Sequence, residues 1–169
     1  MIFSSALKYE FTYGIPSLDI QPSAKIAGLG VFTTRDIKAG CEIYRSRHNA
    51  ILQFPNDHSI QIETDSHLYD STIAFVNHSC EPNALFDTVS WTLIALKDIC
   101  QDEEITIFYP ATAWKVAQPF KCLCGKEHCL EQISGAHVIP VNSINDFCPA
   151  NHITALFEIR SLQKSFWQV

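Results

Sequence analysis

Basic residues are scarce in this chain of 169 residues, in which 12 Lys and Arg stand against 18 Asp and Glu for a formal net charge of −6. Proteins that bind nucleic acid through its phosphate backbone depend on clustered Lys and Arg. We therefore expect no direct nucleic-acid binding. An acidic protein attracts cationic peptides instead, so the composition favours a partner with a basic segment.

Long apolar runs are also missing. No run approaches the roughly 18 residues that a membrane-spanning helix needs, and residues 1–7 lack the basic leader of a secretory signal. Seven cysteines, an odd number with three of them bunched at positions 122–129, favour thiolate ligands in a reducing compartment over disulfides. We expect no membrane association and an intracellular location, in the nucleus or cytoplasm.

Charged side chains make up only 18% of the sequence, whereas 47% of the residues are hydrophobic. Disorder requires the opposite balance. A chain of this length buries roughly 70% of the surface that it would expose when unfolded. The sequence therefore predicts one folded domain with a real core.

Short apolar segments separated by turn residues dominate the chain and indicate a β-rich fold. Strict alternation of apolar and polar residues predicts a strand at 7–13, and further strands are expected at 18–20, 41–44, 51–54, 84–86, 91–96 and 104–109. Near-helical spacing predicts a helix between Pro149 and Phe166 that packs on the domain through Ile153, Leu156, Phe157, Ile159, Leu162 and Phe166. Residues 138–148 resemble a linker.

The nonapeptide from Phe75 to Asn83 is the segment on which the other signals converge, because it combines Asn77, His78 and Cys80. Upstream, Gly28-Leu29-Gly30 permits close approach of backbone, although alone it indicates only a tight turn. It does not match a phosphate-binding loop, since no third glycine and no Lys-Ser or Lys-Thr pair follows. Downstream, Tyr109 stands at the end of a predicted strand.

Three cysteines at the spacing Cys122-x-Cys124-x4-Cys129 offer thiolates for a structural zinc ion, which takes four tetrahedral ligands. The fourth ligand has to come from elsewhere. His128 is adjacent to Cys129, so both can hardly reach one ion, and His137 follows after a turn. Cys80 is the candidate that would fasten this segment to the nonapeptide.

The other histidines and cysteines do not show metal-ligand spacing. We expect His58 and His67 to be ordinary surface or half-buried residues. Cys41, Cys100 and Cys148 are expected to pack as small buried hydrophobic residues.

Taken in order, these motifs resemble those of the SET-domain protein lysine methyltransferases. Residues 28–32 resemble the first motif of that family, residues 75–83 its Asn-His-Ser-Cys-x-Pro-Asn signature, and residues 103–109 its Glu-Glu-Leu-Thr-x-x-Tyr strand. Residues 122–129 resemble its post-SET zinc motif. The likeness covers about residues 18–132.

The resemblance implies a β-rich α+β SET-domain fold with a pseudoknot, a short post-SET zinc clasp and a C-terminal helix. The N-terminal strands and SET domain would occupy residues 1–117. The zinc clasp would occupy 118–132, and a helical C-terminal extension 133–169.

The resemblance also implies methyl transfer from S-adenosylmethionine, with cofactor and substrate entering one channel from opposite faces. Tyr109 would be the catalytic residue, with its phenol beside the methyl group, and Leu123 would cover the adenine. The cofactor would be held by backbone at Gly28, Leu29 and Gly30 and by Asn77 and His78. A structural zinc ion would be held by Cys80, Cys122, Cys124 and Cys129.

Three positions depart from the family pattern. Ala74 stands where the family often has arginine, so one anchor near the cofactor site is missing or replaced. Phe108 replaces a common aspartate. Ile107 occupies the position that affects how many methyl groups are added, and its lack of a hydroxyl favours multiple methylation.

The leading interpretation is an S-adenosylmethionine-dependent methyltransferase that acts on lysine side chains of a protein, such as a histone tail. One alternative is methylation of another amine or a small molecule, suggested by the short segment between Tyr44 and Phe75. The other is a catalytically silent SET-like binding module, for which Ala74 is the only hint.

Overall fold

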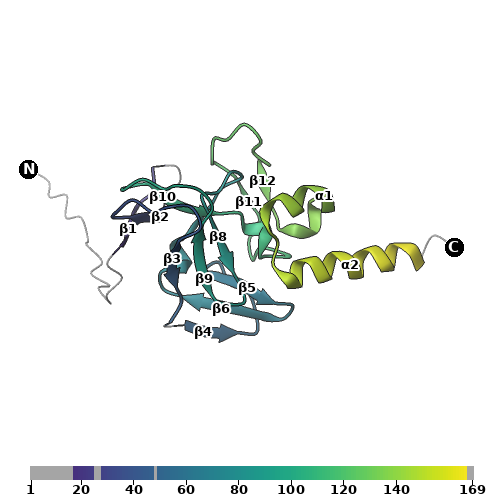
Figure 1. Ribbon diagram of the computed structural model, residues 1–169. Coiled ribbons are helices and arrows are strands. Elements are labelled where there is room, and N and C mark those ends of the chain that lie inside the picture. Colours follow the sequence, from purple (N-terminus) through teal and green to yellow (C-terminus); the bar gives the residue numbers. More distant parts are fainter. Residues whose placement is uncertain (1–16, 25–27, 48, 167–169) are drawn as a thin grey trace, which may run out of the picture.

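The computed structural model describes residues 17–24, 28–47 and 49–166, and the predicted strand at 7–13 lies outside them. Small β-sheets form one side of the molecule, and two helices, α1 (Val141–Ile144) and α2 (Asn151–Phe166), lie on the other (Figure 1). This arrangement confirms the predicted β-rich α+β class. None of the helices in the described ranges is long and apolar enough to cross a bilayer.

Four strands in the order β1-β2-β10-β7 form the sheet that positions the site. They are β1 (Leu18–Pro22), β2 (Leu29–Thr33), β10 (Glu104–Ile107) and β7 (Asn77–His78). β10 pairs antiparallel with β2 and parallel with β7. Segments from three distant parts of the sequence therefore meet at β10.

The other strands form two three-stranded sheets, ordered β3-β9-β8 and β4-β6-β5, and the pair β11-β12. Their bounds are β3 (Glu42–Arg45), β4 (Asn49–Leu52), β5 (Ser59–Glu63), β6 (Ser66–Asp70), β8 (Ala84–Asp87), β9 (Thr92–Ala95), β11 (Phe120–Lys121) and β12 (Gln132–Ile133). The strands predicted within the described ranges all form, with ends shifted by one or two residues. The last strand stops at Ile107, because Tyr109 begins the 3-10 turn η2 (Tyr109–Ala111), which contains Pro110.

The main hydrophobic core lies between these sheets. Val31, Leu93 and Ile105 are 0% exposed, and Leu68 and Ile99 are 1% exposed. Each side chain comes from a different strand or loop, so the core joins the sheets to one another. Truncating one such side chain to alanine typically costs about 2–5 kcal/mol.

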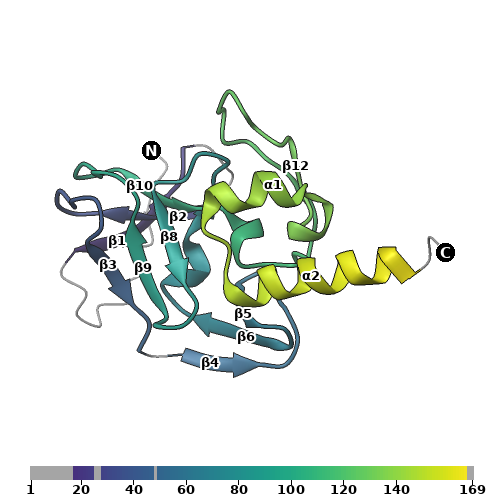
Figure 2. The same cartoon turned by 45° about the vertical axis from the view of Figure 1, so that its right-hand side comes forward.

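The carboxyl-terminal part packs on the domain through a second core. Ile153 and Phe157 of α2 are buried against Phe108 and Ala111, which confirms that the predicted helix packs on the domain (Figure 2). The predicted apolar face is too wide, because Ile159 is 50% exposed and Leu162 is 61% exposed.

Residues 138–148 are not the predicted linker. They follow the 3-10 turn η3 (Ala136–Val138) and contain α1 and a further 3-10 turn, η4 (Asn145–Phe147). Ile139 and Ile144 are buried in the second core. The apolar residues of this segment are isolated among polar ones and show no helical periodicity, so this packing could not be predicted from the sequence.

Some expectations for single residues are wrong. His67 is 7% exposed rather than half-buried, because β6 turns it toward the interior. Cys41, Cys100 and Cys148 are exposed rather than packed. All three lie outside the strands and α2, and Cys148 has a positive φ of 49° at the end of η4. His58 is exposed, as expected.

A buried carboxylate, Asp70, anchors the segment that leads into the nonapeptide. Asp70 is 1% exposed, and its Oδ2 accepts hydrogen bonds from Tyr44 Oη at 2.9 Å and Ser46 Oγ at 2.7 Å. Its Oδ1 accepts from the backbone N–H groups of Thr72 and Ile73 at 2.8 and 3.1 Å. These bonds start the 3-10 turn η1 (Ile73–Phe75) immediately before β7.

We predict that Asp70→Ala lowers the free energy of unfolding by about 3 kcal/mol or more, because several buried donors lose their acceptor at once. Urea denaturation followed by circular dichroism measures the change. Asp98→Ala is the control, since Asp98 pairs with Lys38 on the surface and its loss should change stability little. Equal stability of both variants would contradict the anchoring role of Asp70.

Candidate functional site

The nonapeptide lies directly against β10. Asn77 and His78 pair in parallel with Thr106 and Ile107, and the N–H of Ser79 donates to the Ile107 carbonyl at 3.0 Å. This crossing is the part of the predicted pseudoknot that the described residues display. The pairing places β10 beside β7, although β8 and β9 lie between them in the sequence.

Asn83 fixes the far end of the nonapeptide to the same strand. Its Nδ2 donates to the Glu104 carbonyl at 2.9 Å and to Glu103 Oε1 at 3.1 Å, and its Oδ1 accepts from the Thr106 N–H at 2.8 Å. Asn83 is only 3% exposed. Its amide therefore replaces backbone partners that β10 would otherwise lack on that side.

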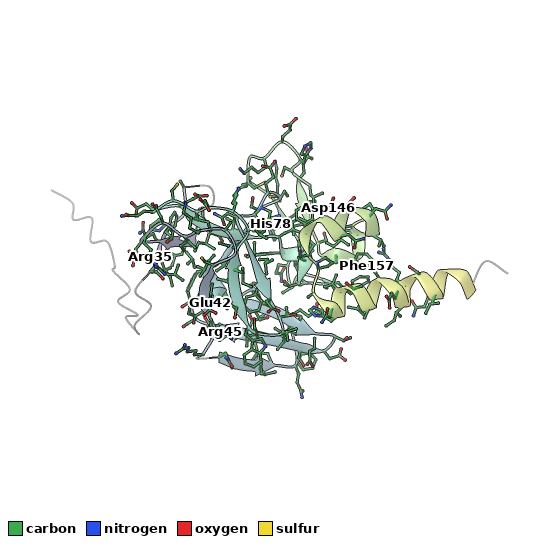
Figure 3. All side chains as sticks on the ribbon, viewed as in Figure 1. Arg35, Glu42, Arg45, His78, Asp146 and Phe157 are labelled. Carbon is green, nitrogen blue, oxygen red and sulfur yellow. The ribbon has the colours of Figure 1, made fainter. Side chains whose placement is uncertain are left out.

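A cavity of about 430 Å³ opens beside this crossing. We group its lining residues by segment and call Asn77, His78, Glu104 and residues 120–124 the nonapeptide wall. Residues 55–61, 112, 113 and 115–118 are called the β5 wall. Ile73, Val76, Ile107 and Tyr109 also line the cavity. Figure 3 labels His78 where the sheets, the β11-β12 loop and the C-terminal helices meet.

Two of the residues predicted to hold the cofactor, Asn77 and His78, line the cavity, and the glycine turn packs behind them. Asn77 Nδ2 donates to the Leu29 carbonyl at 3.0 Å and to Glu104 Oε1 at 2.7 Å. A Cβ on Gly30 would overlap Glu104 Oε1 and lie 3.0 Å from Asn77 Nδ2. A side chain at position 30 would therefore displace the Glu104 carboxylate from its present position. Gly28 precedes β2 and is exposed.

His78 is held in one tautomer by its neighbours. Its Nδ1 accepts from the Tyr109 N–H at 3.2 Å, so the proton resides on Nε2, which faces Cys80 Sγ at 3.4 Å. Burial lowers the pKa of His78 to about 4. The ring is therefore neutral near pH 7 and serves to connect the nonapeptide with the start of η2.

Tyr109 lines the same cavity as His78 and Val76. Its hydroxyl donates to the Val76 carbonyl at 2.9 Å, and its ring packs against those of His78 and Phe120, with centroids 5.3 and 5.9 Å away. Burial, with a contribution from the Glu104 charge, raises the pKa of Tyr109 to about 12. The phenol is therefore a fixed, neutral hydrogen-bond donor.

The sulfur atoms of Cys80, Cys122, Cys124 and Cys129 all lie within 4.8 Å of one another. Four sulfurs around a tetrahedral zinc ion, each about 2.3 Å from the metal, would lie about 3.8 Å apart. The Cys80–Cys122 separation is 3.9 Å. The alternative fourth ligand, His137, instead places Nδ1 2.9 Å from the Trp114 carbonyl oxygen.

The chemistry of these thiols also fits a metal site. Burial raises the pKa of Cys80 to about 11 and raises that of Cys122 further. Four thiolates cannot gather in a partly buried pocket unless a cation compensates their charge. The cluster is therefore suited to a closed, structural zinc ion that fastens residues 122–129 to the nonapeptide.

Two features of the cavity were missed by the sequence reasoning. Glu104 was interpreted as part of a strand motif and of an acidic run with Asp98, Asp102 and Glu103, and not as the cavity-lining residue that it is. His67 was taken as an ordinary residue but lines the cavity. Gly30 offered a signal for Glu104, since a glycine at a strand end indicates that another group approaches closely. Leu123, predicted to cover the adenine, lines the cavity and is 55% exposed.

We predict that the protein binds one zinc ion per chain and that removal of the metal lowers the melting temperature by well over 10 °C, because the site joins distant segments. Metal content by mass spectrometry and thermal unfolding with and without chelator test this. Cys129→Ser should lose the metal, whereas Cys148→Ser should keep it. Equal melting temperatures with and without bound zinc would refute the role.

A family model for the SET domain matches residues 28–110. Methyltransferase flvH of Aspergillus flavus is 32% identical over 88 residues, which cover 51% of this chain and 49% of that protein. Putative histone-lysine N-methyltransferase 1 of Plasmodium falciparum is 29% identical over 105 residues, or 58% of this chain and 1% of that protein. The chain thus spans about half of the first relative and a very small part of the second.

Solved structures resemble the described fold. The structure of KRYPTONITE in complex with mCHG DNA and SAH gives a TM-score of 0.55 at 24% identity, covering 68% of this chain and 28% of that one. The methyltransferase domain of human histone-lysine N-methyltransferase SETMAR gives 0.53 at 21%, covering 70% and 58%. Likeness at this identity shows the fold. Residues 28–110 therefore match the SET domain, and the described fold resembles those of these solved structures.

Proposed function

We propose that this chain is an S-adenosylmethionine-dependent methyltransferase that acts on lysine side chains of a protein. The observation that carries the proposal is the single cavity lined by Asn77, His78 and Tyr109. The relatives support it, because one is named a histone-lysine N-methyltransferase and the solved KRYPTONITE structures contain SAH, one of them with an H3(1-15) peptide.

The chemistry requires alignment more than it requires acid or base groups. S-adenosylmethionine supplies an activated methyl group on a sulfonium sulfur. Asn77 and His78 would hold it from the nonapeptide wall, and Tyr109, fixed by its bond to the Val76 carbonyl, would orient the reacting groups. Ile73 and Ile107 contribute apolar side chains to the cavity lining, which would help to exclude water from the line of transfer.

The acceptor amine has to lose its proton before it attacks. At an ordinary lysine pKa near 10.4 this costs about 4–5 kcal/mol at pH 7, and transfer into an apolar cavity lowers the amine pKa and the cost. Tyr109 stays protonated because its pKa is about 12, and both His78 nitrogens already face partners. Neither of these two side chains can therefore serve as general base, and the chemistry requires no dedicated one, because the proton can leave to solvent before transfer.

The proposed partner is a protein with a basic segment, such as a histone tail, and the proposed location is intracellular, in the nucleus or cytoplasm. The net charge of −6 supports a cationic partner over nucleic acid. Asp57 on the β5 wall adds an acidic group where the acceptor would enter.

A second candidate is a small amine as acceptor. The segment between Tyr44 and Phe75 forms only the compact sheet β4-β6-β5, so it offers little surface for a long peptide. Lys115 on the β5 wall would also attract an acceptor that carries a carboxylate. The named Aspergillus relative is called a methyltransferase with no protein substrate in its name.

We predict that Tyr109→Phe lowers the rate of methyl transfer by about 100-fold or more, since an oriented group at the reacting centre is lost. Its affinity for S-adenosylhomocysteine should change by less than about threefold. The assay follows label from methyl-labelled S-adenosylmethionine into core histones, a basic-protein mixture and a panel of small amines. Tyr69→Phe is the control, because Tyr69 is 39% exposed on β6.

The panel separates the candidates. Label on lysine supports the main proposal, and label only on small amines supports the second candidate. Binding of S-adenosylhomocysteine without any label would leave a silent binding module. Full activity in Tyr109→Phe would refute the role of the phenol.

We predict multiple methylation of the acceptor by the wild-type protein, because Ile107 is 2% exposed beside Tyr109 and has no hydroxyl to hold a water molecule. Ile107→Thr introduces a hydroxyl and removes one methyl group, and it should shift the product toward the monomethyl form. Ile107→Val controls for the lost methyl group. Mass spectrometry that finds only monomethyl product from wild type would contradict the prediction.

A further inference from the structure

Glu104 places a carboxylate in the nonapeptide wall, although the sequence motifs assign it no role beyond its place in the strand. Its Oε1 accepts from Asn77 Nδ2 at 2.7 Å, and its Oε2 accepts from Ser23 Oγ at 3.1 Å. It also packs so closely on Gly30 that a Cβ there would overlap it. Three segments that surround the predicted cofactor position therefore converge on one carboxylate.

Among the described residues, the donors that bond to this carboxylate are the neutral side chains of Asn77 and Ser23. The ion pairs among the described residues are Lys38–Asp98, Arg45–Glu42 and Lys126–Glu81, and none includes Glu104. Ala74, which also lines the cavity, brings no positive charge. A carboxylate has about four acceptor positions, so two bonds leave Glu104 able to accept more from the cavity. A cationic group is the ligand that such a carboxylate favours.

The position of Glu104 indicates which cationic group of the cofactor it would bind. Glu104 begins β10, and Tyr109 follows two residues after that strand ends. The two side chains have different partners in the cavity lining, because Tyr109 packs on His78 and Phe120 whereas the Glu104 carboxylate bonds to Asn77 and Ser23. The sulfonium belongs beside Tyr109 in the proposed reaction. The second positive group of the cofactor, its α-ammonium, is the one that can reach Glu104.

We propose that Glu104 is a binding residue for the α-ammonium group of S-adenosylmethionine, an inference that rests on the proposed function. Asn77 holds the carboxylate in place, and Gly30 leaves the space that it occupies. A charge-assisted hydrogen bond between the ammonium group and the Glu104 carboxylate would anchor the cofactor, whereas Ala74, which stands where the family often has arginine, provides no charged contact. This assigns Glu104 to ligand binding and not to the methyl-transfer step.

The test is a cycle of two ligands and two proteins, measured by calorimetry on zinc-loaded full-length chain. The ligands are S-adenosylhomocysteine and its analogue in which hydrogen replaces the α-amino group. The variant is Glu104→Gln, because glutamine keeps an oxygen for Asn77 and can still bond to Ser23 while it removes the charge. Glu103→Gln is the matched control, since the Glu103 carboxylate bonds to Asn83 and the Cys100 N–H instead.

Wild type should bind S-adenosylhomocysteine about tenfold or more tightly than the analogue, and Glu104→Gln should reduce that preference to about twofold or less. Glu103→Gln should keep the wild-type preference. Equal binding of both ligands by wild type would overturn the proposal without any use of the variant, and so would an undiminished preference in a folded Glu104→Gln protein. If wild type binds neither ligand, the proposed function itself fails.

Discussion

The side chain of Asn83 is the interaction on which the arrangement of the site depends. It makes hydrogen bonds to Glu103, Glu104 and Thr106 from a nearly fully buried position, and thereby attaches the end of the nonapeptide to β10. A buried amide with this many partners has no equivalent alternative orientation, because any other would leave donors or acceptors unsatisfied. The register between the nonapeptide and β10 is therefore fixed, and with it the distance between Asn77 and the turn that carries Tyr109.

Asn77 and His78, the two residues of β7, contact different parts of the site. Toward β2, Asn77 connects Leu29 with Glu104 and closes the nonapeptide wall. Toward the carboxyl terminus, His78 receives the Tyr109 N–H and faces Cys80, so the same histidine touches both the tyrosine turn and the cysteine cluster. A zinc ion at that cluster would make the loop after β11 a fixed part of the wall. The proposed cofactor site and the proposed zinc site therefore share His78, so that order in one site supports order in the other.

The sequence predicted the elements better than their contacts. The cysteine spacing and the nonapeptide were sufficient to predict the cluster, and the structure selects Cys80 over His137 because only Cys80 is brought near the other sulfurs. Glu104 was missed because its place in the wall depends on the packing of Gly30 and Asn77, which no local pattern encodes. The segment 138–148 was misjudged for a related reason, since Ile139 and Ile144 are buried by tertiary contacts and not by helical periodicity.

The central claim is that the crossing of the nonapeptide and β10 forms the cofactor site. Hydrogen–deuterium exchange of the zinc-loaded protein with and without S-adenosylhomocysteine tests it most directly, because it locates the ligand without any assumption about the acceptor. The account predicts added protection at residues 28–31, 75–79, 104–109 and 120–124, with α2 and β4 unchanged. Protection confined to other segments, or none at saturating ligand, would contradict it.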